Sequence, residues 1–206
     1  MTRRLRETEM KDTLIRRGIH RKLLRKHHAC TGTLVVDELG IKHGRRRADI
    51  AVIGGHLNGF EIKSDKDSLC RFEGQVRVYN AVFDHATLVT TQRHMAKAQM
   101  MIPEWWGIIL CSMGARGAVK FRTVRRARRN PSVDLISVAE LLWRDEAQTV
   151  LRGRGAPERL LREQRSVLYD HLVNSLSAAD LRRTVRECLK NRRNWRKELT
   201  TKGGDK

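Results

Sequence analysis

The segment Arg47-Ala-Asp-Ile-Ala-Val-Ile53 is followed by Gly54-Gly55 and then by His56-Leu-Asn-Gly-Phe-Glu-Ile-Lys63. Both flanking runs are apolar and bounded by turn residues, and paired glycines between two such runs are typical of a hairpin turn. We therefore predict a β-hairpin over residues 47–63. Glu61 and Lys63 are two residues apart, so they project from the same face of their strand, and the hairpin brings Asp49 close to them.

Outside the hairpin, the apolar residues alternate between helical and strand spacing. Residues 6–27 fit a basic amphipathic helix, whereas residues 33–39 fit either a short helix or a strand. We expect Asp67-Ser68 to cap a helix of about sixteen residues, by the preference of these residue types for the N-cap. A capping box at Ser137–Glu140 predicts a helix that runs to Val150.

The remaining elements follow from the same patterns. Strands are predicted at residues 86–91, 105–111 and 118–124, and helices at residues 92–101, 158–176 and 178–198, the last capped by Ser177. The alternation indicates an α/β fold, a mixed β-sheet flanked by helices. The tryptophans Trp105, Trp106 and Trp143 are interpreted as core residues.

The best candidate boundary in the chain is the Gly- and Pro-containing stretch from Gly153 to Pro157. We predict a core domain over residues 1–152, including the basic N-terminal helix, and a basic helical C-terminal extension over residues 153–206. The apolar stripe of the last helix includes Leu181, Val185 and Leu189, and its other face is strongly positive. That face could contact a nucleic acid backbone or remain solvated while the stripe packs on the core.

The 206 residues include 43 Lys and Arg against 23 Asp and Glu, a net charge of +20. Such an excess favours a polyanionic partner, and nucleic acid fits better than a membrane because no stretch is long and apolar enough to span a bilayer. The 4 cysteines are scattered without a CxxC pair, so neither a zinc site nor a disulfide framework is indicated. Reduced thiols in a cytoplasmic protein are the expectation.

Asp49, Glu61 and Lys63 together provide the groups that phosphodiester hydrolysis requires. Two converging carboxylates repel each other, and a cation relieves that repulsion. Carboxylate oxygens with retained water are the ligands that Mg²⁺ accepts, and the metal would activate a water and neutralise charge on a phosphate. Lys63 could orient the attacking water. Each residue alone would more often form an ordinary surface ion pair or strand end, but their co-occurrence in a highly basic chain favours the catalytic interpretation.

Asp49 followed by Gly-Phe-Glu61-Ile-Lys63 and a helix resembles the motif of the PD-(D/E)XK nuclease superfamily, with its restriction-endonuclease-like fold. The resemblance implies that Asp49 and Glu61 bind Mg²⁺ or Mn²⁺ and that Lys63 assists the attacking water. An upstream helical Glu often joins that site, and Glu38 stands where it is expected. Ala48 replaces the Pro of the family name.

Gln75-Val-Arg-Val-Tyr79 resembles the Q-x-x-x-Y element of RecB-like and Cas4-like members of that superfamily. The resemblance implies that Gln75 and Tyr79 help to hold the substrate or the metal site, with Arg71 beside them. An ordinary amphipathic helix is the alternative interpretation. Pro103–Gly107 and Leu141–Glu146 resemble parts of a little-characterised bacterial and phage family within the superfamily. This second resemblance does not imply any activity.

The cluster Arg45–Arg47 immediately precedes Asp49, so it would lie near a bound phosphate. Arg47, on the same strand face as Asp49, is the preferred phosphate contact and Arg46 a second one, since guanidinium groups bind phosphate oxygens in a bidentate manner.

The sequence therefore predicts a Mg²⁺- or Mn²⁺-dependent nuclease, with DNA favoured over RNA as the substrate and RNA left open. Two alternatives from other classes stay open. One is a catalytically silent nucleic-acid-binding module on the same fold, and the other is a protein-interaction partner whose positive charge meets an acidic protein. A homodimer also stays open, because nuclease families of this type often act as dimers.

Overall fold

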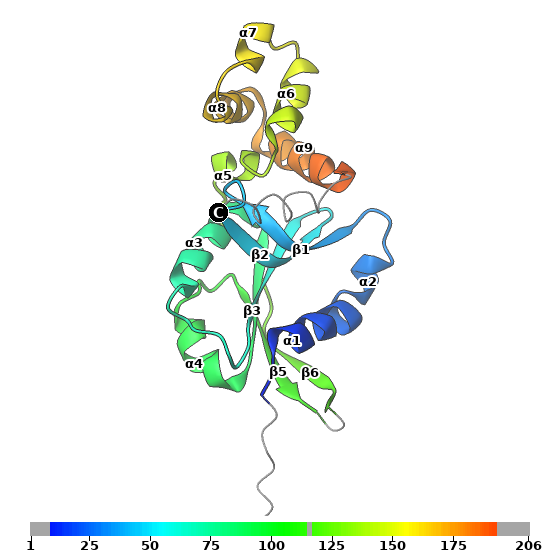
Figure 1. The fold of residues 1–206 in the computed structure, drawn as a ribbon, viewed down its shortest axis with the longest axis vertical. Coiled ribbons are helices and arrows are strands. Elements are labelled where there is room, and N and C mark those ends of the chain that lie inside the picture. The colour runs from blue at the N-terminus through cyan, green and yellow to red at the C-terminus, as the bar shows by residue number, and fades with distance from the viewer. Residues whose placement is uncertain (1–8, 115–116, 193–206) are drawn as a thin grey trace, which may run out of the picture.

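The computed structural model describes residues 9–114 and 117–192. It contains one six-stranded mixed sheet in the order β1-β2-β3-β4-β5-β6, with helices around it (Figure 1). The strands are β1 (Leu34–Ile41), β2 (Arg46–Ile53), β3 (Leu57–Lys63), β4 (His85–Thr90), β5 (Gly107–Met113) and β6 (Val119–Arg125). The helices are α1 (Asp12–Gly18), the π-helical turn η1 (Ile19–Leu23), α2 (Arg25–His28), α3 (Phe72–Val82), α4 (Gln92–Met100), α5 (Leu135–Ala139), α6 (Arg144–Arg152), α7 (Glu158–Leu161), α8 (Arg165–Ser175) and α9 (Ala178–Asn191).

The predicted hairpin is confirmed, because β2 and β3 pair in antiparallel fashion. The ambiguous segment at residues 33–39 is a strand, β1, which pairs antiparallel with β2. β3, β4 and β5 run parallel, which requires the crossover connections that α3 and α4 provide. β6 returns antiparallel to β5. The predicted α/β fold with a mixed sheet and flanking helices is thus confirmed.

The sheet has a separate buried cluster on each face. On one face, Ile15 and Ile19 of the N-terminal helical segment pack against Ile50, Val52 and Ile62, and we call this the α1-side core. The other face packs against α3 and the C-terminal helices, and we call it the α3-side core; it includes Phe72, Val76, Tyr79, Trp105 and Trp106. Burial of apolar area on both faces stabilises a central sheet of this kind.

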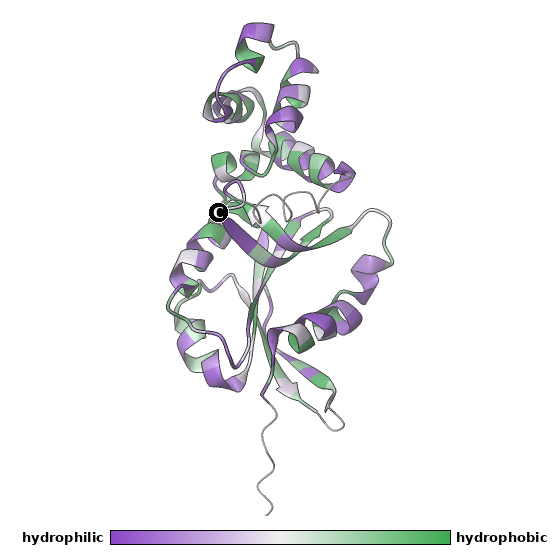
Figure 2. Cartoon of the chain, in the orientation of Figure 1, coloured by the Kyte–Doolittle hydropathy of each residue, from purple (hydrophilic) through white to green (hydrophobic). Residues whose placement is uncertain are grey.

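Four helix predictions needed correction, three of them in residues 6–150. The helix predicted at residues 6–27 is divided into α1, η1 and α2 within its described part, and α2 is entirely hydrophilic (Figure 2). Asp67 does not cap α3. Its carboxylate accepts hydrogen bonds from the backbone and hydroxyl of Ser64, and α3 starts later, at Phe72. The helix predicted to open at Ser137 is two helices, α5, capped by Asp134, and α6.

The C-terminal helices α5 to α9 form a layer at one end of the sheet (Figure 1). Residues on both sides of Gly153 belong to the α3-side core, including Leu151 of α6 and Leu168 of α8. The turn between β1 and β2 joins this layer through His43, whose ring stacks on Tyr169 at 5.7 Å between centroids. The division at residue 153 stays a prediction, but the helices that flank it share one buried cluster.

The helix predicted over residues 158–176 is broken into α7 and α8, whereas Ser177 caps α9 as predicted, accepting a hydrogen bond from the backbone of Asp180. Residues 193–198 of the last predicted helix lie outside the described residues. In residues 9–114 and 117–192, no helix combines the length and apolar character needed to cross a membrane.

Candidate active site

Asp49 and Glu61 lie where β2 and β3 separate. Backbone pairing between these strands ends at Ile50 and Phe60, and the next pair in the same register would be Asp49 and Glu61. The Asp49 carboxylate instead accepts a hydrogen bond from the backbone N–H of Ile62 at 2.7 Å. The strands therefore part at the residues that carry the acidic side chains.

The hydroxyl of Tyr79, on α3, bridges the two separating strands. It accepts a hydrogen bond from the backbone N–H of Asp49 at 3.2 Å and donates one to the carbonyl oxygen of Phe60 at 3.0 Å. These bonds satisfy two backbone groups that strand pairing leaves free, as buried polar groups require. Tyr79 is only 1% exposed. Its hydrogen bonds position the backbone around Asp49, and its hydroxyl also interacts with the carboxylate of Glu61. The implied part of Tyr79 in holding the substrate or the metal site stays a prediction.

The alternation of side chains along β1 and β2 shifts by one residue at Glu38 and Asp49. Val36 and Leu39 both pack with the α3-side core although they are three residues apart, and so do Ala48 and Ala51. Glu38 has a φ of 56°, a left-handed backbone conformation that is uncommon outside glycine. This local irregularity accompanies the contacts that Glu38 and Asp49 make with α1.

Glu61, Lys63 and Gln75 form a buried hydrogen-bonded group on the α3 side. The Nζ of Lys63 donates to Oε1 of Glu61 at 2.6 Å and to Oε1 of Gln75 at 2.9 Å, and it lies 5.2 Å from the ring centroid of Phe72. Glu61 is 0% exposed. Among the described residues, its second oxygen, Oε2, has no hydrogen-bond partner. One buried carboxylate oxygen thus lacks the partner that such atoms normally have.

Burial disfavours the ionised forms of both carboxylates. Burial raises the pKa of Asp49 to about 7, and the negative charge of Glu61 adds to the increase. Burial also raises the pKa of Glu61, against the opposing effect of Lys63. A positively charged ligand between the two carboxylates would remove this cost.

Arg16 of α1 was not predicted as a site residue, yet it contacts the site directly. Its guanidinium donates to the backbone carbonyl of Asp49 and lies 3.5 Å from Oδ1 of the same residue. It also lies 3.0 Å from Glu38, 3.2 Å from Asp12 and 3.9 Å from Asp37. The spacing of Asp12 and Arg16, four residues apart on a helix, was the only sequence signal that could have drawn attention to this residue.

The upstream Glu of the resembled superfamily is helical, whereas Glu38 is part of a strand, and its participation in the site stays a prediction. Glu38 lies on β1, not on a helix, and its carboxylate pairs with Arg16. Asp37, its neighbour, accepts from His20 at 2.9 Å, and His20 in turn contacts His28 at 3.0 Å. Asp49, Glu61, Lys63 and Gln75 are therefore brought together, whereas Glu38 lies across Arg16 from them.

The donor set fits a cation that retains water. Within the described part of the chain, no cluster of three or more His, Cys, Asp or Glu side chains has a geometry that could hold a metal ion. What Asp49 and Glu61 offer is a pair of carboxylates with one unpaired oxygen, and Mg²⁺ is commonly held by one or two carboxylates plus water. The residues present fit Mg²⁺ or Mn²⁺ on this basis.

The predicted phosphate contacts are exposed to solvent, but they take no part in the hydrogen bonds and ion pairs of Asp49 and Glu61. Arg46 and Arg47 are exposed at the start of β2, and Arg71 is exposed immediately before α3. No hydrogen bond or ion pair joins any of the three to the carboxylates within the described residues. Their place at the ends of the elements that carry Asp49 and Gln75 keeps them as candidates for contacting a bound polyanion.

Comparison with known proteins gives the family. The profile described as bacteriophage P4 protein cII matches residues 1–202. The chain belongs to the bacteriophage P4 protein cII family. The chain is 26% identical to protein cII of Enterobacteria phage P4 over 192 residues, which cover 93% of this chain and 69% of that protein. The expected link to a phage family is confirmed.

Among solved structures, this cII family member is similar to the SPO1766 protein of unknown function from Silicibacter pomeroyi. The TM-score is 0.39 and the sequence identity 20%, and the match covers 70% of this chain and 90% of that one. Neither relative's name states an activity, so the function has to be argued from the geometry of the site.

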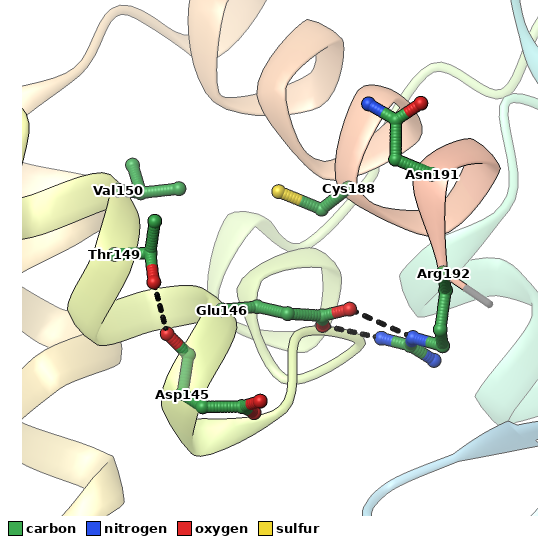
Figure 3. Close-up of a pocket in the computed structure, with 7 residues that line it drawn as sticks. All are labelled: Asp145, Glu146, Thr149, Val150, Cys188, Asn191 and Arg192. Atoms are coloured by element: carbon green, nitrogen blue, oxygen red, sulfur yellow. Dashed lines mark hydrogen bonds and ion pairs between the residues drawn. The ribbon is translucent and has the colours of Figure 1, made fainter. Parts of the chain in front are cut away.

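A cavity of about 250 Å³ lies between α6 and α9, away from the residues described above (Figure 3). It is lined by Asp145, Glu146, Thr149, Val150, Cys188, Asn191 and Arg192. Two of its charged groups, Glu146 and Arg192, are paired with each other. Nε of Arg192 donates to Glu146 at 2.8 Å, and the guanidinium stacks on Trp143 at 4.0 Å from the ring centroid. These contacts are typical of packing between helices, so we do not assign the cavity to catalysis.

Proposed function

We propose that this cII family member is a Mg²⁺- or Mn²⁺-dependent nuclease of the PD-(D/E)XK type that hydrolyses phosphodiester bonds in DNA. The observation that carries the proposal is the buried Glu61–Lys63 pair beside Asp49, with one carboxylate oxygen unpaired and a raised Asp49 pKa. Strongly perturbed carboxylates with a specific basic partner are a common feature of active sites.

Each side chain of the site has a separate role in the proposed hydrolysis. Asp49 and Glu61 would hold the cation, which, when bound, neutralises charge on a phosphate and makes a water molecule a stronger acid. Lys63 is fixed by Glu61 and Gln75, which use two of its three N–H donors. The remaining donor can orient a water or contact a phosphoryl oxygen, where a positive charge stabilises the developing negative charge.

The net charge supports the choice of substrate. The whole chain carries +20, whereas the contacts around the site join five carboxylates (Asp12, Asp37, Glu38, Asp49 and Glu61) to two permanent cations, Arg16 and Lys63. A locally acidic site within a basic protein suits an enzyme that binds a polyanion at its surface and a cation at its centre.

The test is a cleavage assay on purified protein with Mg²⁺ or Mn²⁺, offering single-stranded, duplex and branched DNA beside RNA. We expect cleavage that needs the metal and that Asp49→Ala reduces by on the order of a thousandfold or more, because a metal site contributes several kcal/mol to the barrier. Asp170→Ala, an exposed acidic residue on α8, is the matched control and should cut like the unaltered protein.

Undiminished cutting by Asp49→Ala would refute the site. Salt-sensitive binding of DNA without cleavage in any metal would support the catalytically silent binding module instead. Binding of neither DNA nor metal would leave the protein-interaction partner as the better reading of the positive charge.

A further inference from the structure

The guanidinium of Arg16 lies among four carboxylates supplied by three separate elements. Asp12 comes from α1, Asp37 and Glu38 from β1, and Asp49 from β2. The Arg16 side chain is 18% exposed, so most of its charge is shielded from water by these partners. A cation therefore already lies next to one of the two carboxylates that the proposed metal site requires.

Arg16 contacts the backbone carbonyl of Asp49 more closely than its carboxylate. It donates to the backbone carbonyl oxygen of Asp49, whereas its distance to the carboxylate oxygen Oδ1 is 3.5 Å, which is long for a charge-assisted hydrogen bond. The contacts with Glu38 at 3.0 Å and Asp12 at 3.2 Å are closer. The carboxylate of Asp49 is thus farther from the guanidinium than those of Glu38 and Asp12, and its release leaves these two closest carboxylates in place.

A guanidinium cannot give up its proton under ordinary conditions, so a divalent cation arriving at Asp49 meets a fixed positive charge. Two cations that share one carboxylate repel each other, and in a partly buried site this repulsion is screened only weakly. Accommodation of the divalent cation then requires Arg16 to withdraw from Asp49 toward Asp12 and Glu38.

We propose that Arg16 is an internal cation that occupies the acidic side of the site in the metal-free protein and competes with the divalent cation for Asp49. The proposal rests on the proposed function, because it takes Asp49 and Glu61 as the metal ligands. It assigns a role in the site to α1, which the sequence pattern marked only as a basic amphipathic helix. Arg16 is on this view a positioning residue that sets the affinity of the site for its metal.

The test measures Mn²⁺ binding to the purified full chain by calorimetry or by the electron paramagnetic resonance of free Mn²⁺, with no nucleic acid present. Arg16→Gln should bind Mn²⁺ more tightly than the unaltered protein, on the order of tenfold, because one competing charge is removed. Arg17→Gln removes the same charge from an exposed position on the same helix and should change the affinity by less than about twofold. Asp49→Asn should weaken binding in either background.

The outcomes separate this inference from the proposed function. If Asp49→Asn weakens Mn²⁺ binding but Arg16→Gln binds no more tightly than Arg17→Gln, the competition by Arg16 is refuted and the metal site stands. If neither the unaltered protein nor Arg16→Gln binds Mn²⁺, the metal site fails and the inference fails with it. Should Arg16→Gln not fold, Arg16→Lys replaces it. The ammonium group of a lysine cannot make the multiple contacts of the guanidinium. Arg16→Lys should therefore bind Mn²⁺ more tightly than Arg17→Lys, and equal affinities would overturn the proposal.

Discussion

Two acid–base pairs in this protein look alike in composition but differ in how completely they are satisfied. Glu146 and Arg192 join α6 to the end of α9, and Glu61 and Lys63 lie side by side on β3. Both oxygens of Glu146 have partners, since Arg192 donates to each and the backbone N–H of Trp143 donates to Oε2 at 2.7 Å. Glu61 has one oxygen held by Lys63 and, within the described residues, no partner for the other.

The difference separates a structural ion pair from a candidate functional one. A buried pair stabilises a fold only where its remaining hydrogen-bonding capacity is satisfied, as it is for Glu146. A carboxylate left partly unsatisfied, with a pKa raised by burial, reduces stability and requires another explanation. In the sheet the explanation that we propose is a cation held by Asp49 and Glu61, whereas in the helical layer no such explanation is needed.

The largest expected contrast is in stability. Glu146→Ala should lower the free energy of unfolding by about 3 kcal/mol, because Arg192 is left buried without its carboxylate and Trp143 loses its acceptor. Glu61→Gln should change it by less than about 1 kcal/mol, since the amide oxygen still accepts from Lys63 and the repulsion with Asp49 disappears. Chemical denaturation in the presence of EDTA measures both values.

Asp145→Ala is the control for Glu146→Ala, since it removes an exposed carboxylate from the same first turn of α6. It should cost less than about 1 kcal/mol. If Glu61→Gln destabilises the protein as strongly as Glu146→Ala, the two pairs are equivalent and the distinction drawn between them is wrong.

The next contrast depends on pH and concerns Asp49. Its pKa is about 7 in the folded protein and lies near the ordinary value of 3.8 when the chain unfolds, so the folded state binds the extra proton between these values. Stability from this group is therefore present below pH 4 and is lost as the pH rises to about 7. Asp49→Asn keeps an acceptor for Ile62 but does not titrate. The free energy of unfolding of Asp49→Asn, minus that of the unaltered protein, should therefore increase by about 2 kcal/mol between pH 5 and pH 8.

Denaturation curves at several pH values in EDTA test this expectation. Asp170→Asn, on the exposed surface of α8, should run parallel to the unaltered protein across the range. A stability difference for Asp49→Asn that does not vary with pH would show that Asp49 is ionised throughout, and the argument for a cation between Asp49 and Glu61 would lose its electrostatic basis.

The hairpin and its three chemical residues could be predicted because they depend on local patterns. Paired glycines between apolar runs set the turn, and the two-residue period places Glu61 and Lys63 on one face. The register then follows, and it brings Asp49 near Glu61 without any long-range information. The buried Trp105 and Trp106 were predictable for a similar reason, since large apolar side chains are rarely left in water.

Two helix starts were predicted wrongly because several side chains compete to cap them, whereas α4, α7 and α9 begin at the predicted residues. Asp67 was a reasonable cap for α3, but its carboxylate is engaged by Ser64 in the preceding turn, and the helix begins five residues later. Asp134, rather than Ser137, caps α5. Local sequence shows which residues can cap a helix, whereas the surrounding turn decides which of them does.

Arg16 was missed because its role depends on contacts across the fold. It is 33 residues from Asp49 in the chain, and no periodicity connects them. In the sequence it is one of many basic residues of the helix predicted over residues 6–27, and the excess of positive charge favoured a nucleic acid partner. Only the packing of Ile15 and Ile19 against the sheet brings Arg16, at the edge of the same helix face, to the acidic residues of β1 and β2.

The smallest expected effect concerns the exposed arginines at the start of β2, and it extends the comparison from buried pairs to charges with no assigned partner. Arg46→Ala with Arg47→Ala should weaken binding to duplex DNA only several-fold, because each phosphate contact contributes modestly at physiological salt. The more specific signature is the dependence on salt. Loss of two phosphate contacts should reduce the slope of log affinity against log salt concentration by about two, without changing any preference among sequences. The control variant, Arg93→Ala with Lys97→Ala, removes the same charge from exposed positions on α4. Figure 1 shows α4 on the opposite part of the molecule from the C-terminal helical layer.

If both double variants reduce the slope equally, the DNA is attracted by the overall charge and β2 has no special part in binding it. A reduction confined to the Arg46 and Arg47 variant would place the phosphate backbone beside the strand that carries Asp49.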